Sequence, residues 1–139
     1  MDQRLSLVTL VVADLAATRR FYRDGLGWEP FMDVAEEVLM LRVGEHLLLS
    51  LWDEAAALEE IGPVTRGGTP PVTLAHNVGA PEQVDAVLAD ARRAGAPTVS
   101  DATQREWGGY SGYFTDPDGF MWEVAYAPGP VGDLVVPRA

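Results

Sequence analysis

The 139-residue sequence contains neither cysteine nor lysine. The absence of cysteine excludes disulfide bonds, thiolate metal ligands and thiol nucleophiles. The absence of lysine excludes catalysis through a lysine Schiff base, because all ten basic residues are arginine.

Long hydrophobic runs are also missing. No apolar stretch approaches the ~20 residues that a membrane-spanning helix needs, and no basic stretch followed by a hydrophobic one marks a secretion signal. We therefore expect a cytoplasmic protein with no membrane partner. The formal charge of −11 argues against nucleic acid as a partner. It suits a cationic ligand, although an acidic surface also serves to keep a protein in solution.

The sequence does contain enough apolar residues, 47%, for the core of one domain. Within it, one succession of elements occurs twice, with the two first strands roughly 66 residues apart. The first succession is expected as a strand over 5–12, a helix from Asp14 to about Gly25–Gly27, strands over 28–34, 38–43 and 46–52, and a short helix over 54–60. The second is expected as a strand over 72–78, a helix from Pro81 to Gly95, a short strand over 97–99 and a hairpin over 107–124. This order predicts an α+β fold of two βαβββ modules, about 4–53 and 70–127, whose curled mixed sheets enclose a cleft. Residues 54–69 are the expected connector, and residues 128–139 a surface tail.

The hairpin is the most distinctive stretch of the sequence. Asp116-Pro117-Asp118-Gly119 is typical of a tight turn, since proline presets φ and glycine accepts a positive φ. The strand after this turn is apolar except for Glu123. A carboxylate in such a strand needs a partner, a ligand or solvent, because burying it unpaired costs several kcal/mol.

These motifs resemble those of the vicinal oxygen chelate superfamily, which includes glyoxalase I, bleomycin-resistance proteins and extradiol dioxygenases. The resemblance rests on Asp14-Leu15 with Phe21-Tyr22 and Leu26-Gly27-Trp28, on the run from Trp107 to Tyr113, and on Asp116-Pro117-Asp118-Gly119 with Trp122-Glu123. It covers about residues 5 to 127. It implies the paired-module fold and a homodimer, but one fold hosts many functions.

Metal-using members of that superfamily take four ligands from the strands of the two modules. Carried over position by position, the ligand positions are Leu7, Ser50, Thr73 and Glu123. Only Glu123 is a strong ligand for a divalent metal, so we expect no metal site. The two histidines, His46 and His76, join the set only if the strand register shifts by one residue.

Strand alternation predicts which side chains face the cleft. Glu123 is expected to anchor a polar or cationic group of a ligand or to act as a general base. The alternative is that it is a buried acid whose hydrogen bonds come from neighbouring hydroxyls such as those of Ser50 or Thr73. Trp122 is expected in the core. The expected ligand contacts are Glu123, Met121, Trp107, Tyr110, Trp52, Ser50, Thr73 and Asn77.

Two classes of function remain open at this point. The first is a protein that binds a small organic molecule without a complete metal site, with drug sequestration as one form of it. The second is a glyoxalase-like lyase, isomerase or dioxygenase that uses Glu123 and one divalent metal, Zn, Ni, Mn or Fe. Whether the protein is an enzyme is thus left undecided by the sequence.

Overall fold

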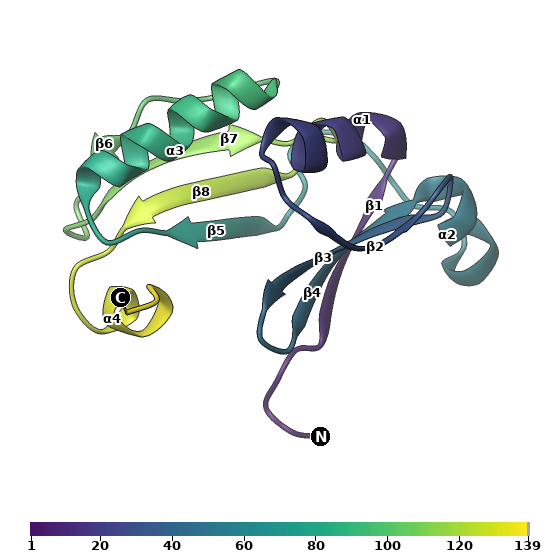
Figure 1. The fold of residues 1–139 in the computed structure, drawn as a ribbon, viewed down its shortest axis with the longest axis horizontal. Helices are drawn as coiled ribbons and strands as arrows, with labels where there is room; N and C mark the ends of the chain where they lie inside the picture. Colours follow the sequence, from purple (N-terminus) through teal and green to yellow (C-terminus); the bar gives the residue numbers. More distant parts are fainter. Residues whose placement is uncertain (139) are drawn as a thin grey trace. The chain divides into compact units, whose positions relative to one another are not determined.

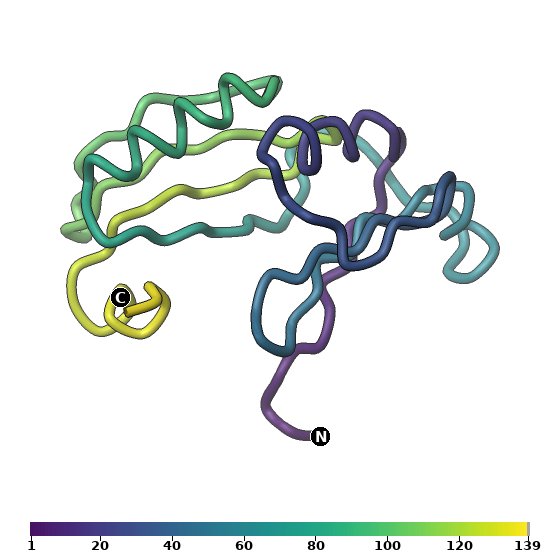
Figure 2. The backbone as a smooth tube through the Cα atoms, viewed as in Figure 1, coloured from purple at the N-terminus to yellow at the C-terminus, as the bar shows by residue number. Residues whose placement is uncertain are grey.

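The computed structural model describes residues 1–138, and the chain divides into two compact units. The first unit is Met1–Arg66, and the second begins at Gly67. Each unit holds one four-stranded mixed sheet and its own helices (Figures 1 and 2). The fold is therefore α+β with a repeated module, as predicted.

The first sheet has the strand order β1-β4-β3-β2. Strand β1 runs parallel to β4, and the other neighbours are antiparallel. The elements of this unit are β1 (Leu7–Val12), α1 (Leu15–Arg19), the π-helix η1 (Arg20–Gly25), β2 (Pro30–Val34), β3 (Val38–Gly44), β4 (Leu47–Asp53) and α2 (Glu54–Ile61).

Alternation along these strands separates a buried face from an open one. The buried face packs against α1 and η1, which begin at the predicted cap: the Asp14 carboxylate accepts a 2.9 Å hydrogen bond from the Ala17 N–H. The residues of this core are Leu10, Val12, Leu15, Phe21, Tyr22, Leu39, Leu41, Leu49 and Leu51.

The second sheet repeats the topology with the order β5-β8-β7-β6, and β5 is parallel to β8. Helix α3 lies along one face of it (Figure 1). The predicted stop after α3 is confirmed, since Gly95 adopts a left-handed φ of 94°. The elements of this unit are β5 (Thr73–Asn77), α3 (Pro81–Ala94), β6 (Thr103–Gln104), β7 (Tyr110–Thr115), β8 (Met121–Tyr126) and α4 (Pro130–Val135).

The core of the second unit lies between α3 and the sheet. Val84, Leu88 and Ala91 of α3 are buried with Trp122 and Val124 of β8. Trp122 is 7% exposed and stacks on Phe114, with 6.0 Å between the ring centroids. The prediction that Trp122 belongs to the core is therefore confirmed.

One local prediction was wrong. The expected strand over 97–99 is reduced to a single bridge between Val99 and Phe114, and the edge strand β6 begins only at Thr103. The tail contains helix α4, which a Gly- and Pro-rich sequence does not suggest. Pro130 takes the first helical turn, where its missing N–H costs nothing. Ala139, the last residue of that tail, lies outside the described residues.

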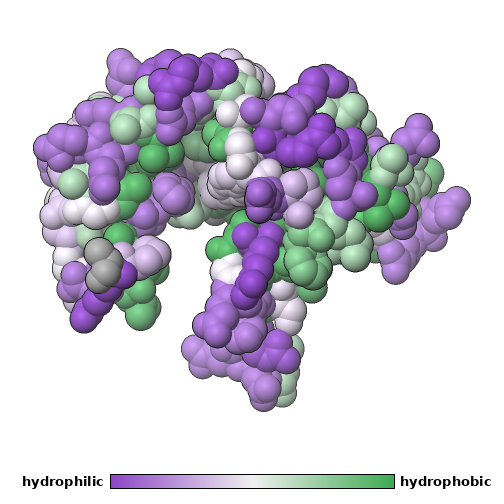
Figure 3. All heavy atoms as spheres, in the orientation of Figure 1, coloured by the Kyte–Doolittle hydropathy of each residue, from purple (hydrophilic) through white to green (hydrophobic). Residues whose placement is uncertain are grey.

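Several hydrophobic side chains remain on the surface of each unit. Leu7 is 44% exposed in the first unit, and Leu134 is 84% exposed on α4 in the second. Hydrophilic side chains cover most of the face in Figure 3, and hydrophobic ones form patches among them. Along residues 1–138, no helix combines the length and apolar character that crossing a membrane requires.

Candidate functional site

The open face of the first sheet carries a groove of about 830 Å³. Strand register brings its floor together, because Thr9 pairs with Ser50 and Ser50 pairs with Met40 across three strands. Trp52 and Val38, which also pair, extend the apolar floor toward α2. The lining residues are Leu7, Thr9, Glu37, Val38, Met40, Ser50, Trp52, Ala56, Glu59 and Glu60.

Helix α2 forms one side of this groove and is fixed in place by polar contacts. The Asp53 carboxylate accepts a 2.9 Å hydrogen bond from the Ala55 N–H and caps the helix. Arg66 donates to the Glu54 carboxylate and to the Val11 carbonyl oxygen, at 3.2 Å each, and so ties α2 to β1. Ala57, a residue of α2, is fully buried. These contacts hold α2 against the first sheet.

The charge around the groove has one sign. Glu37, Glu59 and Glu60 line it and are exposed, while no arginine or histidine is among the lining residues. Carboxylates on the rim of an apolar groove attract cations to it. The two hydroxyls, of Thr9 and Ser50, add neutral hydrogen-bonding groups to the floor.

The open face of the second sheet carries Glu123 at the centre of β8. Its cross-strand partner is Tyr113, whose hydroxyl donates a 2.5 Å hydrogen bond to Glu123 Oε2. This hydrogen bond raises the pKa of the Tyr113 hydroxyl above its ordinary value of 10, and burial and the charge of Glu123 act in the same direction. Glu123 is only half-buried. Within the second unit, its hydrogen-bond partner is thus a tyrosine.

Arg105 completes this group from the hairpin between β6 and β7. Its Nε donates to Ser111 Oγ at 2.9 Å, and its Nη2 donates to the Ser111 carbonyl oxygen at 3.0 Å. The guanidinium carbon lies 5.8 Å from the centroid of the Tyr113 ring, a cation–π distance. Arg105 also opposes the rise in the pKa of Tyr113.

The predicted contacts belong to both units. Ser50 and Trp52 line the groove of the first unit. Register places Met121, Thr73 and Asn77 on the same face of the second sheet as Glu123, since Thr73 pairs with Met121 and Asn77 with Ala125. Sequence reasoning missed Thr9, Met40, Glu37, Glu59, Glu60, Tyr113 and Arg105.

Trp107 and Tyr110 do not join Glu123. Trp107 is 56% exposed, and its indole lies so close over Gly109 that a Cβ there would be 1.9 Å from the ring. Tyr110 is an odd number of residues from Tyr113 on the same strand, so it points to the opposite face, toward α3. Its hydroxyl donates to Asp85 at 2.8 Å, and this hydrogen bond raises the pKa of Tyr110.

The two histidines also lie apart from the open faces. His46 is exposed beside Glu45, 3.5 Å from its carboxylate. His76 pairs with Val124 on the face toward α3, as alternation predicted, and burial lowers its pKa. Within residues 1–138, His, Asp and Glu form no group of three or more that could hold a metal ion.

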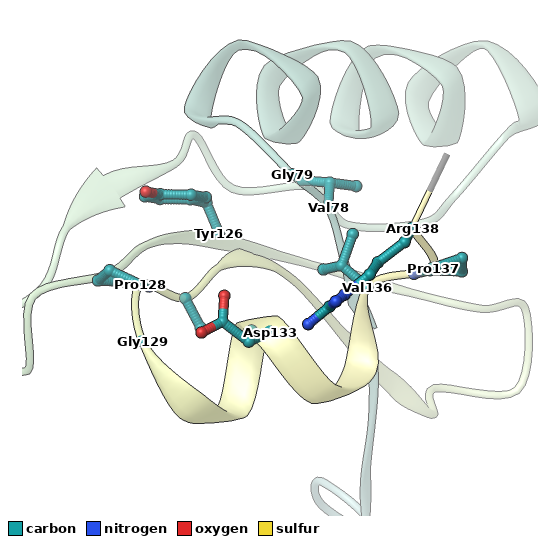
Figure 4. Close-up of a pocket in the computed structure, with 11 residues that line it drawn as sticks. Val78, Gly79, Tyr126, Pro128, Gly129, Asp133, Val136, Pro137 and Arg138 are labelled. Carbon is teal, nitrogen blue, oxygen red and sulfur yellow. The ribbon is translucent and has the colours of Figure 1, made fainter.

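A smaller pocket of about 340 Å³ lies in the second unit beside α4. It is lined by Tyr126 from the end of β8, by Val78 and Gly79 before α3, and by residues of α4 and the tail. Figure 4 shows Asp133 and Arg138 directed toward the same space. None of the predicted contacts lies in it.

The chain matches one family model, that of the Glyoxalase/Bleomycin resistance protein/Dioxygenase superfamily, over residues 4–124. The protein belongs to this superfamily. A search of curated proteins found no match.

Solved structures of other members share the fold. A glyoxalase-related enzyme from Fulvimarina pelagi is 31% identical, with 91% of this chain and 89% of that chain covered and a TM-score of 0.80. A glyoxalase/bleomycin resistance protein/dioxygenase from Nocardioides is 24% identical, with coverages of 94% and 87% and a TM-score of 0.75. A lactoylglutathione lyase from Agrobacterium tumefaciens is 22% identical, with coverages of 91% and 95% and a TM-score of 0.69.

The residues at the superfamily's metal positions do not fit a divalent metal in this member. Leu7 has no donor atom, and Ser50 and Thr73 offer only neutral hydroxyls. Ser50 is 3% exposed in the floor of the groove, while Leu7 presents an apolar side chain to it. Glu123 is the one carboxylate of the four, and it already accepts the Tyr113 hydroxyl. Divalent metals need several imidazole or carboxylate ligands, which this set does not supply.

Proposed function

We propose that the protein binds a small organic cation with an apolar body, without a metal, in the groove of its first sheet. The observation that supports this most is the composition of the groove: an apolar floor with Trp52 and Met40 under a rim of three glutamates. Trp52 is half-buried and offers a ring on which a planar cation can stack. Ser50 and Thr9 supply hydrogen bonds that orient it.

The proposal extends to sequestration of a cationic drug as opposed to its conversion. The superfamily's description includes bleomycin resistance protein, and the residues that line the groove include no histidine that could activate the Ser50 or Thr9 hydroxyl. The other predicted class, a metal-dependent lyase, isomerase or dioxygenase, needs ligands that Leu7, Ser50 and Thr73 do not supply. We also propose a homodimer, which the exposed apolar side chains of both units support.

The test compares two nearly isosteric probes, 9-aminoacridine, a cation at neutral pH, and acridine, which is neutral. We expect isothermal titration to give tighter binding of the cation. Glu37→Gln combined with Glu59→Gln and Glu60→Gln should weaken it by about 30-fold, because three exposed carboxylates contribute about 2 kcal/mol together. High salt should reduce the difference in 9-aminoacridine affinity between wild type and this triple variant.

The matched control changes the net charge by the same amount elsewhere. Glu29→Gln, Glu45→Gln and Glu106→Gln replace three exposed glutamates that do not line the groove. This variant should bind 9-aminoacridine within about twofold of wild type at moderate salt, since exposed charges far apart are screened. Equal weakening by both triple variants would contradict the assignment of the rim, and equal binding of both probes would contradict the preference for a cation.

A further inference from the structure

Arg105 differs from the arginines whose role in the structure is plain. Arg19, Arg66 and Arg92 each pair with a carboxylate, as do others. Arg105 pairs with none within residues 1–138, and its hydrogen bonds go to the neutral oxygens of Ser111 alone. It is nevertheless half-buried, on a sheet face whose other charged group is Glu123. A fixed, partly desolvated guanidinium without a counter-ion is a strong receptor for a carboxylate.

The hydrogen bonds that hold Arg105 leave part of the guanidinium unused. Nε and one N–H of Nη2 are bound to Ser111, which is 1% exposed and therefore a rigid acceptor. Nη1 makes no hydrogen bond in the part of the chain that the structure describes. The Tyr113 ring supports the guanidinium from one side. The orientation of Arg105 is thus set before any ligand arrives, which lowers the entropic cost of binding.

Glu123 contacts the same tyrosine through its hydroxyl, while the Arg105 guanidinium lies over the face of the ring. The Tyr113 hydroxyl donates to Glu123 Oε2, which leaves acceptor positions on the carboxylate for a second donor. The open face therefore presents a cation and an anion separated by one tyrosine side chain. The formal charge of −11 disfavours a ligand with net negative charge but not one without net charge.

We propose that this face binds a small zwitterion of the amino-acid type, with its carboxylate on Arg105 and its ammonium group on Glu123. Tyr113 positions both groups and is not replaced by the ligand. Every residue of this site lies in the second unit. The proposal therefore does not rest on the groove of the first sheet, and variants of one site leave the residues of the other unchanged.

The probes that test it are L-phenylalanine, L-phenylalaninamide, which lacks the carboxylate, and 3-phenylpropionate, which lacks the ammonium group. Each is titrated into the full-length protein at millimolar concentration, while ¹H–¹⁵N NMR follows the Arg105 Nε–H and the backbone amides of residues 103–113 and 121–125. We expect saturable shifts at these positions with L-phenylalanine and weaker binding of both analogues.

Arg105→Gln should weaken L-phenylalanine by about tenfold or more, because a hydrogen bond to a charged group is lost. Glu123→Gln should weaken L-phenylalanine but strengthen 3-phenylpropionate, because it removes the like charge. Arg92→Gln is the control: Arg92 is an exposed arginine of α3 that pairs with Asp101, and its loss should leave binding unchanged. Arg105→Lys keeps a positive charge and should therefore bind L-phenylalanine more weakly than wild type but more tightly than L-phenylalaninamide. If Arg105→Gln loses the amide dispersion of a folded protein, Arg105→Lys is compared with wild type in its place.

Three results would overturn the proposal. One is the absence of saturable shifts with L-phenylalanine. Another is equal binding of the amino acid and its amide. The third is equal weakening by Arg105→Gln and Arg92→Gln.

Discussion

Trp122→Ala is expected to lower the free energy of unfolding by about 3–5 kcal/mol, the usual cost of truncating a buried tryptophan. Trp122 is 7% exposed between α3 and the second sheet, and its ring stacks on Phe114. Its removal loses apolar burial and an aromatic pair together. Urea unfolding monitored by circular dichroism measures the change.

Trp107→Ala is the matched control, because the same side chain is truncated where it is 56% exposed. We expect this variant to unfold within about 1 kcal/mol of wild type. If the two variants lost similar stability, Trp122 would not be the core residue that its burial indicates.

Asp116→Ala should be the second most damaging change, with a loss of about 2–4 kcal/mol. The carboxylate is fully buried, and its Oδ1 accepts hydrogen bonds from the N–H groups of Asp118 and Phe120, both at 3.0 Å. Alanine removes the acceptor of these two part-buried donors, at about 1–2 kcal/mol each. Thermal and urea unfolding of the variant measure the loss.

The conservative change Asp116→Asn keeps an oxygen in the place of Oδ1 and should retain most of the stability. Asp101→Ala removes a carboxylate that is 93% exposed in its pair with Arg92, and it should cost about 1 kcal/mol or less. A result in which Asp116→Asn and Asp116→Ala are equally unstable would show that the hydrogen bonds of the turn are not what stabilises it.

The hairpin shows how far local sequence determines this fold. Asp-Pro-Asp-Gly predicted the turn, and Gly119 indeed adopts a φ of 89°. Alternation along the strand then placed Trp122 in the core and Glu123 on the open face. These predictions held because turn chemistry and a period of two residues act over short distances.

The partners of Glu123 could not be predicted from the sequence of β8 alone, because they depend on how other strands pair with it. Tyr113 faces Glu123 because the register of β7 against β8 pairs them, and the turn at 116–119 would have given this register. Arg105 reaches the same face through the short strand β6, which two residues define. Nothing in such a stretch distinguishes it from a loop.

The groove of the first unit depends on contacts still farther apart in the chain. Thr9, Met40 and Ser50 come together through three strands, and Glu59 and Glu60 join them because α2 folds back along the sheet. The expected connector over 54–69 therefore contributes part of the groove. Arg66, near its end, fixes α2 through Glu54 and Val11, a tertiary contact that local patterns cannot indicate.

The groove of the first sheet is proposed to bind an organic cation without a metal. The most direct test of this claim is the dissociation constant of 9-aminoacridine measured by isothermal titration, first with protein treated with EDTA and then after addition of Zn²⁺, Ni²⁺, Mn²⁺ or Fe²⁺. We predict saturable binding in EDTA. Neither an added metal nor Glu123→Ala should change the dissociation constant. Binding that requires an added metal and disappears with Glu123→Ala would contradict the claim.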